Sequence, residues 1–139
     1  MKRLAIVGLG LMGSSLGLAA KKNKIAKVVS GYARREETRC EALKRGMVDC
    51  VYDSPGEAVK GADMVVFCLP VLSIPEVAAQ CIPYFEENSV VTDVGSTKAE
   101  LVSQMDKLLG KSKAVFVGSH PIAGAEENGL DAAKVDLYE

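Results

Sequence analysis

Three glycines near the start of the chain limit what this region can fold into. Residues 4–7 form a short apolar run of strand type, and residues 14–22 have the periodicity of a helix. Between them, Gly8, Gly10 and Gly13 are spaced as G-x-G-x-x-G. In a strand–turn–helix unit, the first glycine permits a tight turn and the second lets a phosphate approach the backbone. The third lets the helix pack closely on the strand.

This turn would direct free backbone amides and the positive end of a helix dipole toward a pyrophosphate. We therefore predict that it binds a dinucleotide, although a glycine turn that serves only packing is the alternative. The residues of the predicted turn site are Gly8, Leu9, Gly10, Leu11, Met12 and Gly13.

Short apolar runs rich in β-forming residues alternate with helix-period segments along the rest of the chain. The runs lie at residues 4–7, 27–32, 49–52, 63–69, 89–93 and 114–118. Most are continuously apolar, as strands buried on both faces of a parallel sheet should be. The alternation predicts an α/β fold with a doubly wound parallel sheet of the Rossmann type, in one dinucleotide-binding domain over residues 1–139.

Helix starts are expected where a hydroxyl residue precedes a glutamate by three positions. The pairs are Ser54 with Glu57, Ser73 with Glu76, and Thr97 with Glu100. In such a capping box, the hydroxyl oxygen accepts a hydrogen bond from the backbone amide of the glutamate. All three pairs are therefore predicted to cap helices.

The charges of the chain are balanced, with 17 lysines and arginines against 18 acidic residues. No global field would recruit nucleic acid or an anionic membrane, so the partner must be recognised locally, and a small-molecule substrate is expected. Residues 1–20 imitate a signal peptide, with a basic start and an uncharged run, but the glycines in that run favour a strand–turn–helix unit. A cytoplasmic protein is expected.

The four cysteines, Cys40, Cys50, Cys68 and Cys81, form neither a C-x-x-C pair nor a cluster with histidine. Their arrangement favours reduced structural thiols over a disulfide or zinc framework. No metal site is predicted.

The end of the second strand should indicate which dinucleotide binds. A carboxylate there would bind the ribose 2′-hydroxyl of NAD, but this position is Ala33, followed by Arg34 and Arg35. Two guanidinium groups can hold the 2′-phosphate of NADP by charge-assisted hydrogen bonds. The sequence thus favours NADP over NAD, and the alternative is that both arginines are solvated residues at a helix start.

Ligands of such sheets bind outside the carboxyl ends of the strands. Leu69, Pro70 and Val71 follow the fourth strand, and Gly95 and Ser96 follow the fifth, so both segments are predicted to lie near the nicotinamide. His120, the only histidine, follows the sixth strand. A neutral imidazole there can accept a proton from a substrate hydroxyl, although a lone histidine is more often a packed or surface residue.

Three motifs together resemble the prephenate and arogenate dehydrogenase family over the whole chain. They are the glycine turn, Asp93-Val94-Gly95-Ser96-Thr97-Lys98, and His120-Pro121-Ile122-Ala123-Gly124 with Glu126 and Gly129. The histidine motif is the specific one, because many dehydrogenases share the glycine turn.

This resemblance implies an oxidoreductase of tyrosine biosynthesis that oxidatively decarboxylates its substrate. His120 would accept the proton of the substrate hydroxyl, and Ser96 would lie between that hydroxyl and the nicotinamide. Glu126 would help to shape the substrate entrance, with a solvated loop carboxylate as the alternative. Lys98 is interpreted as a helix-start residue, and Ala125 departs from a position that often carries a hydroxyl.

Family members continue into a helical second domain that supplies a substrate arginine and most of a homodimer contact, and this domain is absent from the sequence. We therefore expect these residues to bind cofactor but to turn over prephenate or arogenate poorly. Two other functions stay open: another Rossmann-type reductase, such as a hydroxyacid dehydrogenase or imine reductase, and a stand-alone, non-catalytic nucleotide-binding module.

Overall fold

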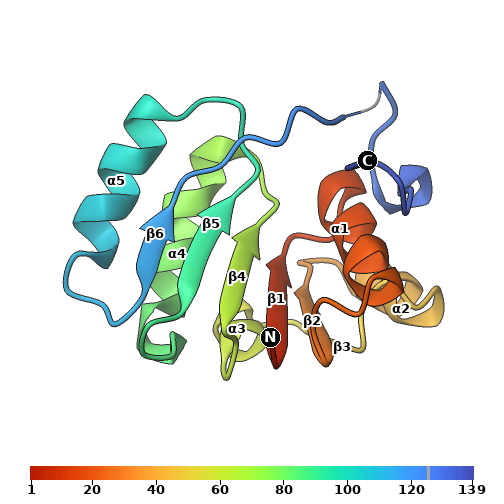
Figure 1. The fold of residues 1–139 in the computed structure, drawn as a ribbon, viewed down its shortest axis with the longest axis horizontal. Coiled ribbons are helices and arrows are strands. Elements are labelled where there is room, and N and C mark those ends of the chain that lie inside the picture. The colour runs from red at the N-terminus through yellow and green to blue at the C-terminus, as the bar shows by residue number, and fades with distance from the viewer. Residues whose placement is uncertain (125) are drawn as a thin grey trace.

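The computed structural model describes residues 1–124 and 126–139. Its centre is a six-stranded, all-parallel sheet with the strand order β3-β2-β1-β4-β5-β6 (Figure 1). The strands are β1 (Arg3–Val7), β2 (Val28–Tyr32), β3 (Cys50–Tyr52), β4 (Met64–Phe67), β5 (Val90–Asp93) and β6 (Val115–Val117). Each predicted run forms one of these strands, so the doubly wound Rossmann-type fold is confirmed.

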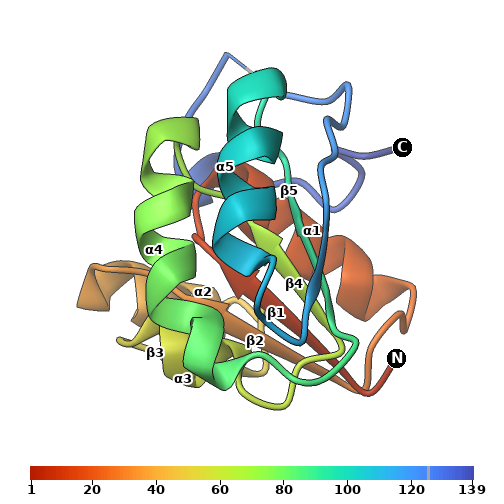
Figure 2. The ribbon, with the colours of Figure 1, turned by 90° about the vertical axis from the view of Figure 1, so that its left-hand side faces the viewer.

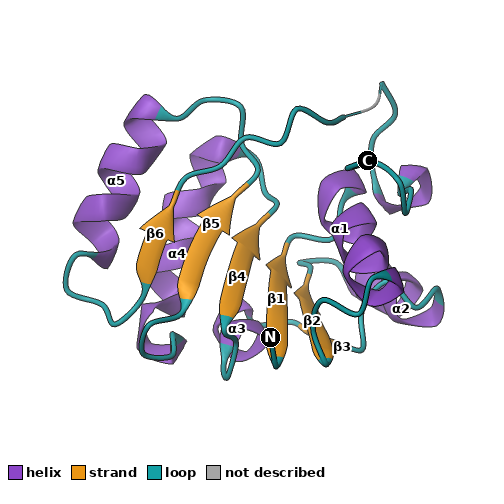
Figure 3. Cartoon of the chain, in the orientation of Figure 1, coloured by secondary structure: helices purple, strands orange, loops and turns teal. Residues whose placement is uncertain are grey.

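Helices cover both faces of the sheet (Figure 3). They are α1 (Leu11–Lys22), α2 (Glu36–Lys44), α3 (Pro55–Val59), α4 (Ile74–Cys81) and α5 (Ala99–Leu109), with short 3₁₀ turns η1 (Val71–Ser73), η2 (Ile82–Tyr84) and η3 (Leu130–Ala132). One core packs α3, α4 and α5 against the sheet, and the second packs α1 and α2 against the other face. In Figure 2, α4 and α5 lie in front of the sheet.

The strand order reverses between β1 and β4, because β1 pairs in parallel with β2 on one side and with β4 on the other. The chain runs outward from β1 to β3, and then crosses to β4 on the other side of β1. Loops leaving β1 and β4 therefore diverge, which opens a crevice at the carboxyl edge of the sheet. The predicted site segments all follow strands at this edge.

Small residues, and not the leucines of the helix, let α1 lie close to the sheet. The helical spacing of Leu16, Ala19 and Ala20 predicts an inner face for this helix, but of the three only Ala20 is buried, and Leu16 and Ala19 are partly buried. Gly17 is buried, and a Cβ there would lie 2.2 Å from the carbonyl oxygen of Met47. The close approach thus depends on a missing side chain, which apolar periodicity does not register.

Of the three predicted capping boxes, one is confirmed and two are wrong. Ser54 caps α3, because its Oγ accepts a hydrogen bond from the Glu57 amide at 3.4 Å. Ser73 precedes α4 but has helical dihedral angles, since η1 runs directly into α4, and its side chain makes no capping bond. Thr97 lies one residue too early, because Lys98 is the N-cap of α5.

No helix in the described part of the chain has both the length and the apolar character needed to cross a membrane.

Candidate functional site

The three glycines of the turn each have the geometry expected of them. Gly8 has φ +108°, and a Cβ there would lie 2.4 Å from the Cys68 carbonyl oxygen. At Gly13 a Cβ would lie 1.9 Å from the Gly8 carbonyl oxygen, so the helix touches the turn. Gly10 is exposed, is the N-cap of α1, and has no atom within 4 Å of a Cβ position. Space for a ligand thus lies at Gly10, in front of the free amides of a helix N-terminus.

A cavity of about 960 Å³ opens at this turn. Several predicted cofactor residues line it: Gly8, Leu9, Gly10, Ala33, Arg34, Arg35, Leu69 and Pro70. Other predicted residues, which do not line it, are Leu11, Met12, Gly13, Val71, Gly95 and Ser96. The cavity therefore joins the loops after β1, β2 and β4, while the loop after β5 lies outside it.

At the end of β2, Ala33 is buried while Arg34 and Arg35 are exposed and line the cavity. Within residues 1–124 and 126–139, neither arginine side chain forms a hydrogen bond or an ion pair. Arg39 of α2 holds their loop, because its Nη1 donates to the carbonyl oxygens of Ala33 and Arg34 at 2.8 and 2.9 Å. Sequence reasoning missed Arg39, although its place one helical turn after Arg35 could have suggested a contact.

The C-terminal segment forms a further wall of the cavity, which the sequence did not predict. Its lining residues are Gly129, Leu130 and Asp131. Asp131 pairs with Arg45 at 2.7 Å. The Lys134 amide donates to Ser15 Oγ at 2.9 Å, and the Tyr138 hydroxyl donates to the Met12 carbonyl at 2.8 Å. These contacts bind the segment to α1 and α2.

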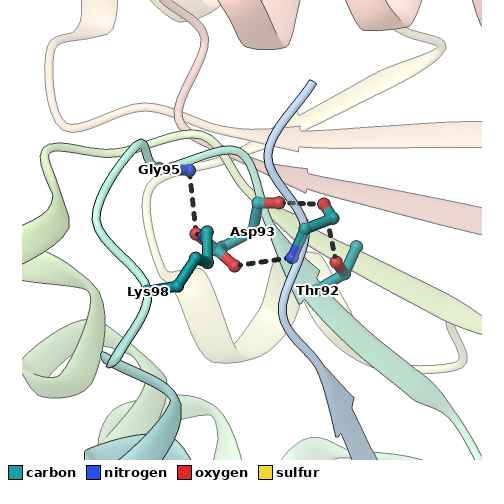
Figure 4. A network of polar contacts seen from close by, with 5 residues as sticks. Thr92, Asp93, Gly95 and Lys98 are labelled. Carbon is teal, nitrogen blue, oxygen red and sulfur yellow. Dashed lines mark hydrogen bonds and ion pairs between the residues drawn. The ribbon is translucent and has the colours of Figure 1, made fainter. Parts of the chain in front are cut away.

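A buried carboxylate organises the loops after β5 and β6 (Figure 4). Asp93, the last residue of β5, has no exposed surface. Its Oδ2 accepts the Gly95 amide at 2.8 Å and also pairs with the Lys98 ammonium. Its Oδ1 accepts the Ser119 amide at 3.3 Å. The Ser119 hydroxyl donates to the Asp93 carbonyl, and Thr92 Oγ1 donates to Ser119 Oγ at 3.1 Å.

The predicted catalytic residues lie next to this network. Ser96 directly follows Gly95, and His120 directly follows Ser119; both are exposed. Because β5 and β6 are neighbours in a parallel sheet, the two residues share its carboxyl edge. No side-chain hydrogen bond joins Ser96 to His120 in the described residues. Lys98 is confirmed at the helix start, and its pairing with Asp93 was not foreseen.

Glu126 is exposed in the loop beyond His120. Its two interpretations, a substrate-entrance residue and a solvated carboxylate, both stay predictions. Ala125 lies outside the described residues.

All four cysteines are free thiols, and Cys40 is exposed whereas Cys81 is buried. Burial raises the pKa of the Cys68 thiol to about 12, helped by the negative charge of Asp93, and burial alone raises the pKa of Cys81 to about 12. The described residues hold no group of three or more histidine, cysteine or acidic side chains that could bind a metal ion.

These pKa values predict selective alkylation. At pH 8, a thiol with a pKa near 12 is ionised in roughly one molecule in ten thousand, so iodoacetamide should label Cys40 and leave Cys68 and Cys81 unmodified. Their labelling rate should rise about tenfold with each pH unit, because the thiolate is the nucleophile. Peptide mass spectrometry would measure the alkylation of each cysteine. As a control, all four cysteines should react in denaturant. Equal rates at Cys40 and Cys68 in the folded protein would contradict this prediction.

The sheet, the glycine turn and the cavity together define a dinucleotide-binding α/β domain. The family model described as prephenate dehydrogenase, nucleotide-binding domain, matches residues 16–139. The chain belongs to this family, as the sequence resemblance had indicated.

Relatives support the same family over the whole chain. A prephenate dehydrogenase of Lactococcus lactis subsp. cremoris is 37% identical over 143 residues, which cover 100% of this chain and 39% of the relative. The crystal structure of prephenate dehydrogenase from A. aeolicus in complex with hydroxyphenyl propionate and NAD+ has a TM-score of 0.90 and 32% identity, covering 100% of this chain and 48% of that one. The crystal structure of Synechocystis arogenate dehydrogenase has a TM-score of 0.88 and 28% identity, covering 97% of this chain and 46% of that one. The chain thus spans less than half the length of these relatives.

Proposed function

We propose that this chain is the cofactor-binding part of an oxidoreductase that oxidatively decarboxylates prephenate or arogenate with a nicotinamide dinucleotide. One observation carries the proposal. The loops with Ser96 and His120 are bonded to a single buried carboxylate, at the sheet edge where the glycine turn opens a cavity. The names of the relatives, which include a prephenate and an arogenate dehydrogenase, support the substrate class.

The residues of the cavity fit a dinucleotide. Gly10 leaves open space in front of the α1 N-terminus, where a pyrophosphate would accept hydrogen bonds from backbone amides. Leu69 and Pro70 would contact the part of the cofactor that runs from this turn toward β4 and β5. The cavity does not reach Ser96, so the nicotinamide would extend beyond it toward the Asp93 network.

When bound, the nicotinamide supplies a hydride acceptor for the hydroxyl-bearing ring carbon of the substrate. His120, exposed at the end of β6, would accept the proton of that hydroxyl as the carbon becomes a carbonyl. Ser96 would hydrogen-bond the same oxygen and hold it at a fixed distance from the cofactor. Loss of the ring carboxylate as carbon dioxide then makes the ring aromatic, which drives the reaction forward.

NADP is the cofactor that we propose, because the position of a ribose-binding acid is the buried Ala33, and beside it lie two guanidinium groups that have no partner among the described residues. Arg34→Ala plus Arg35→Ala should weaken NADP binding by roughly 30-fold or more, since a hydrogen bond to a charged group contributes about 1.5–3 kcal/mol. The affinity for NAD should not change. Fluorescence titration of both cofactors measures the two Kd values.

The matched control for this double substitution is Lys107→Ala plus Lys111→Ala, which removes the same charge from exposed positions on and after α5. It should leave both affinities unchanged. Equal affinities of the wild type for NADP and NAD would refute the proposed preference.

The decisive experiment is a two-by-two assay of prephenate and arogenate with NADP and NAD, on the longest native protein that contains this chain. We expect turnover of at least one substrate, and poor or absent turnover by residues 1–139 alone. Cofactor binding without turnover of either substrate in the longer protein would favour a non-catalytic nucleotide-binding module. Robust turnover by the 139-residue chain would refute our expectation that it needs a further domain.

A further inference from the structure

We propose that Asp93 is a positioning residue that fixes Ser96 and His120 relative to each other. The inference rests on the proposed function, because it assigns the Asp93 carboxylate a role in the same site. Asp93 has no exposed surface and does not line the cofactor cavity. A buried carboxylate is costly unless hydrogen bonds and an opposite charge stabilise it. Here the opposite charge is that of Lys98, and the two backbone amides come from the residues that immediately precede Ser96 and His120.

On the β5 side, the carboxylate shapes the loop that leads to Ser96. The Gly95 amide donates to Asp93 Oδ2 at 2.8 Å across a two-residue turn. A Cβ at Gly95 would lie 2.9 Å from this oxygen and 2.6 Å from Val71 Cγ2. The loop is therefore confined between the carboxylate and η1, one residue before Ser96.

On the β6 side, the same carboxylate extends the connection between the two strands beyond their ladder. The parallel pairing of β5 with β6 ends at Thr92 and Val117. Two residues later, the Ser119 amide donates to Asp93 Oδ1 at 3.3 Å, and the Ser119 hydroxyl bonds to the Asp93 carbonyl. Asp93 thus holds the residue before His120 where backbone pairing no longer does.

Both contacts need an acceptor, one on each carboxylate oxygen. Oδ2 accepts the Gly95 amide and pairs with the Lys98 ammonium, and Oδ1 accepts the Ser119 amide. Only donors therefore face the two oxygens. An asparagine has one oxygen and one NH₂ group, and its NH₂ would face a donor on one side. One loop would therefore lose its hydrogen bond to the side chain in Asp93→Asn. Catalytic groups must be held within about 0.5 Å of their productive geometry, so a shift of either loop separates the pair.

His120 is the only histidine of the chain, so its imidazole gives a single, directly assigned NMR signal. The experiment records the Cε1–Hε1 correlation of ¹³C-labelled histidine without and with saturating NADP+. In the wild type, cofactor should shift this signal, because the proposed nicotinamide position adjoins both loops. In Asp93→Asn the shift should fall below half of the wild-type value, while Kd for NADP+ changes by less than about threefold, since Asp93 does not line the cofactor cavity.

Two controls separate positioning from general stability and from charge. Asp63 Oδ2 also accepts two backbone amides, those of Lys2 and Arg3 at 2.7 and 2.9 Å, but at the amino ends of the strands. Asp63→Asn should keep the wild-type shift. Asp93→Asn combined with Lys98→Met removes the unpaired ammonium but does not restore the second acceptor. If Asp93 positions both loops, the cofactor-induced shift of the His120 signal in this double variant stays as small as in Asp93→Asn.

The outcomes are distinct. A wild-type signal that does not respond to saturating cofactor refutes the proposed nicotinamide position, and the inference falls with it. If the wild-type signal responds normally and the response persists in Asp93→Asn, the inference about Asp93 is refuted, while the proposed nicotinamide position stands. The same holds if Lys98→Met restores the response in the double variant. If circular dichroism shows Asp93→Asn to be unfolded, Ser119→Ala carries the test, because it removes the hydroxyl contacts of the β6 loop. Its cofactor-induced shift must then be smaller than that of the wild type, and an unchanged shift refutes the inference.

Discussion

Asparagine in place of His120 is expected to lower kcat by about 10²- to 10⁴-fold, the usual contribution of a general base. The side chain is exposed and has no hydrogen-bonding partner in the described residues, so the thermal midpoint should stay close to that of the wild type. Kd for NADP+ should also be unchanged, because the imidazole does not line the cofactor cavity. Steady-state kinetics on the longest native protein, with a separate cofactor titration, would measure these effects.

Glu127→Gln is the matched control for His120→Asn, since Glu127 is exposed in the same segment and has no assigned role. It should retain wild-type kcat. An unchanged kcat in His120→Asn would remove the proposed proton acceptor and favour a binding role for the domain. A parallel loss of cofactor affinity would instead mean that His120 holds the cofactor.

Valine at Gly13 is expected to destabilise the domain by about 3 kcal/mol or more, above the ordinary range for overpacking. The reason is that its Cβ would lie 1.9 Å from the Gly8 carbonyl oxygen, so two backbone segments must separate. Cofactor binding should be lost as well, because the turn and the α1 N-terminus move apart. Chemical denaturation with a cofactor titration would measure both losses.

Gly10→Ala tests the same turn from its open side. Nothing lies within 4 Å of its Cβ position, so the free energy of unfolding should change by less than about 1 kcal/mol. Cofactor affinity should still fall, because the methyl group occupies the space through which a phosphate approaches. Equal destabilisation by Gly10→Ala and Gly13→Val would contradict the different roles of the two glycines.

The strands and the turn were predictable because their causes are local. A strand buried on both faces must be continuously apolar, and the turn needs glycine at fixed spacing. The capping boxes predicted at Ser73 and Thr97 are wrong because the spacing of a hydroxyl residue and a glutamate does not specify backbone dihedral angles. Ser73 already has helical angles. Local pattern thus predicts elements better than their boundaries.

The long-range contacts of the site could not be predicted. Ser119 binds Asp93 across 26 positions, and Asp131 binds Arg45 across 86. No periodicity links residues at such separations, because the strand order and the path of the C-terminal segment bring them together. The sequence therefore indicated which loops carry chemistry, but not that Asp93 joins two of them.

The wall formed by residues 129–131 has a consequence for the order of events during synthesis. Its attachment to α1 includes the hydrogen bond from Tyr138 to Met12, two residues that are 126 positions apart. A nascent chain can form the glycine turn early, but its cavity lacks this side until residues 129–131 have left the ribosome, and the Tyr138 contact forms later still. We therefore expect cofactor to protect the released domain from proteolysis, and to give a ribosome-bound chain that ends before η3 much less protection.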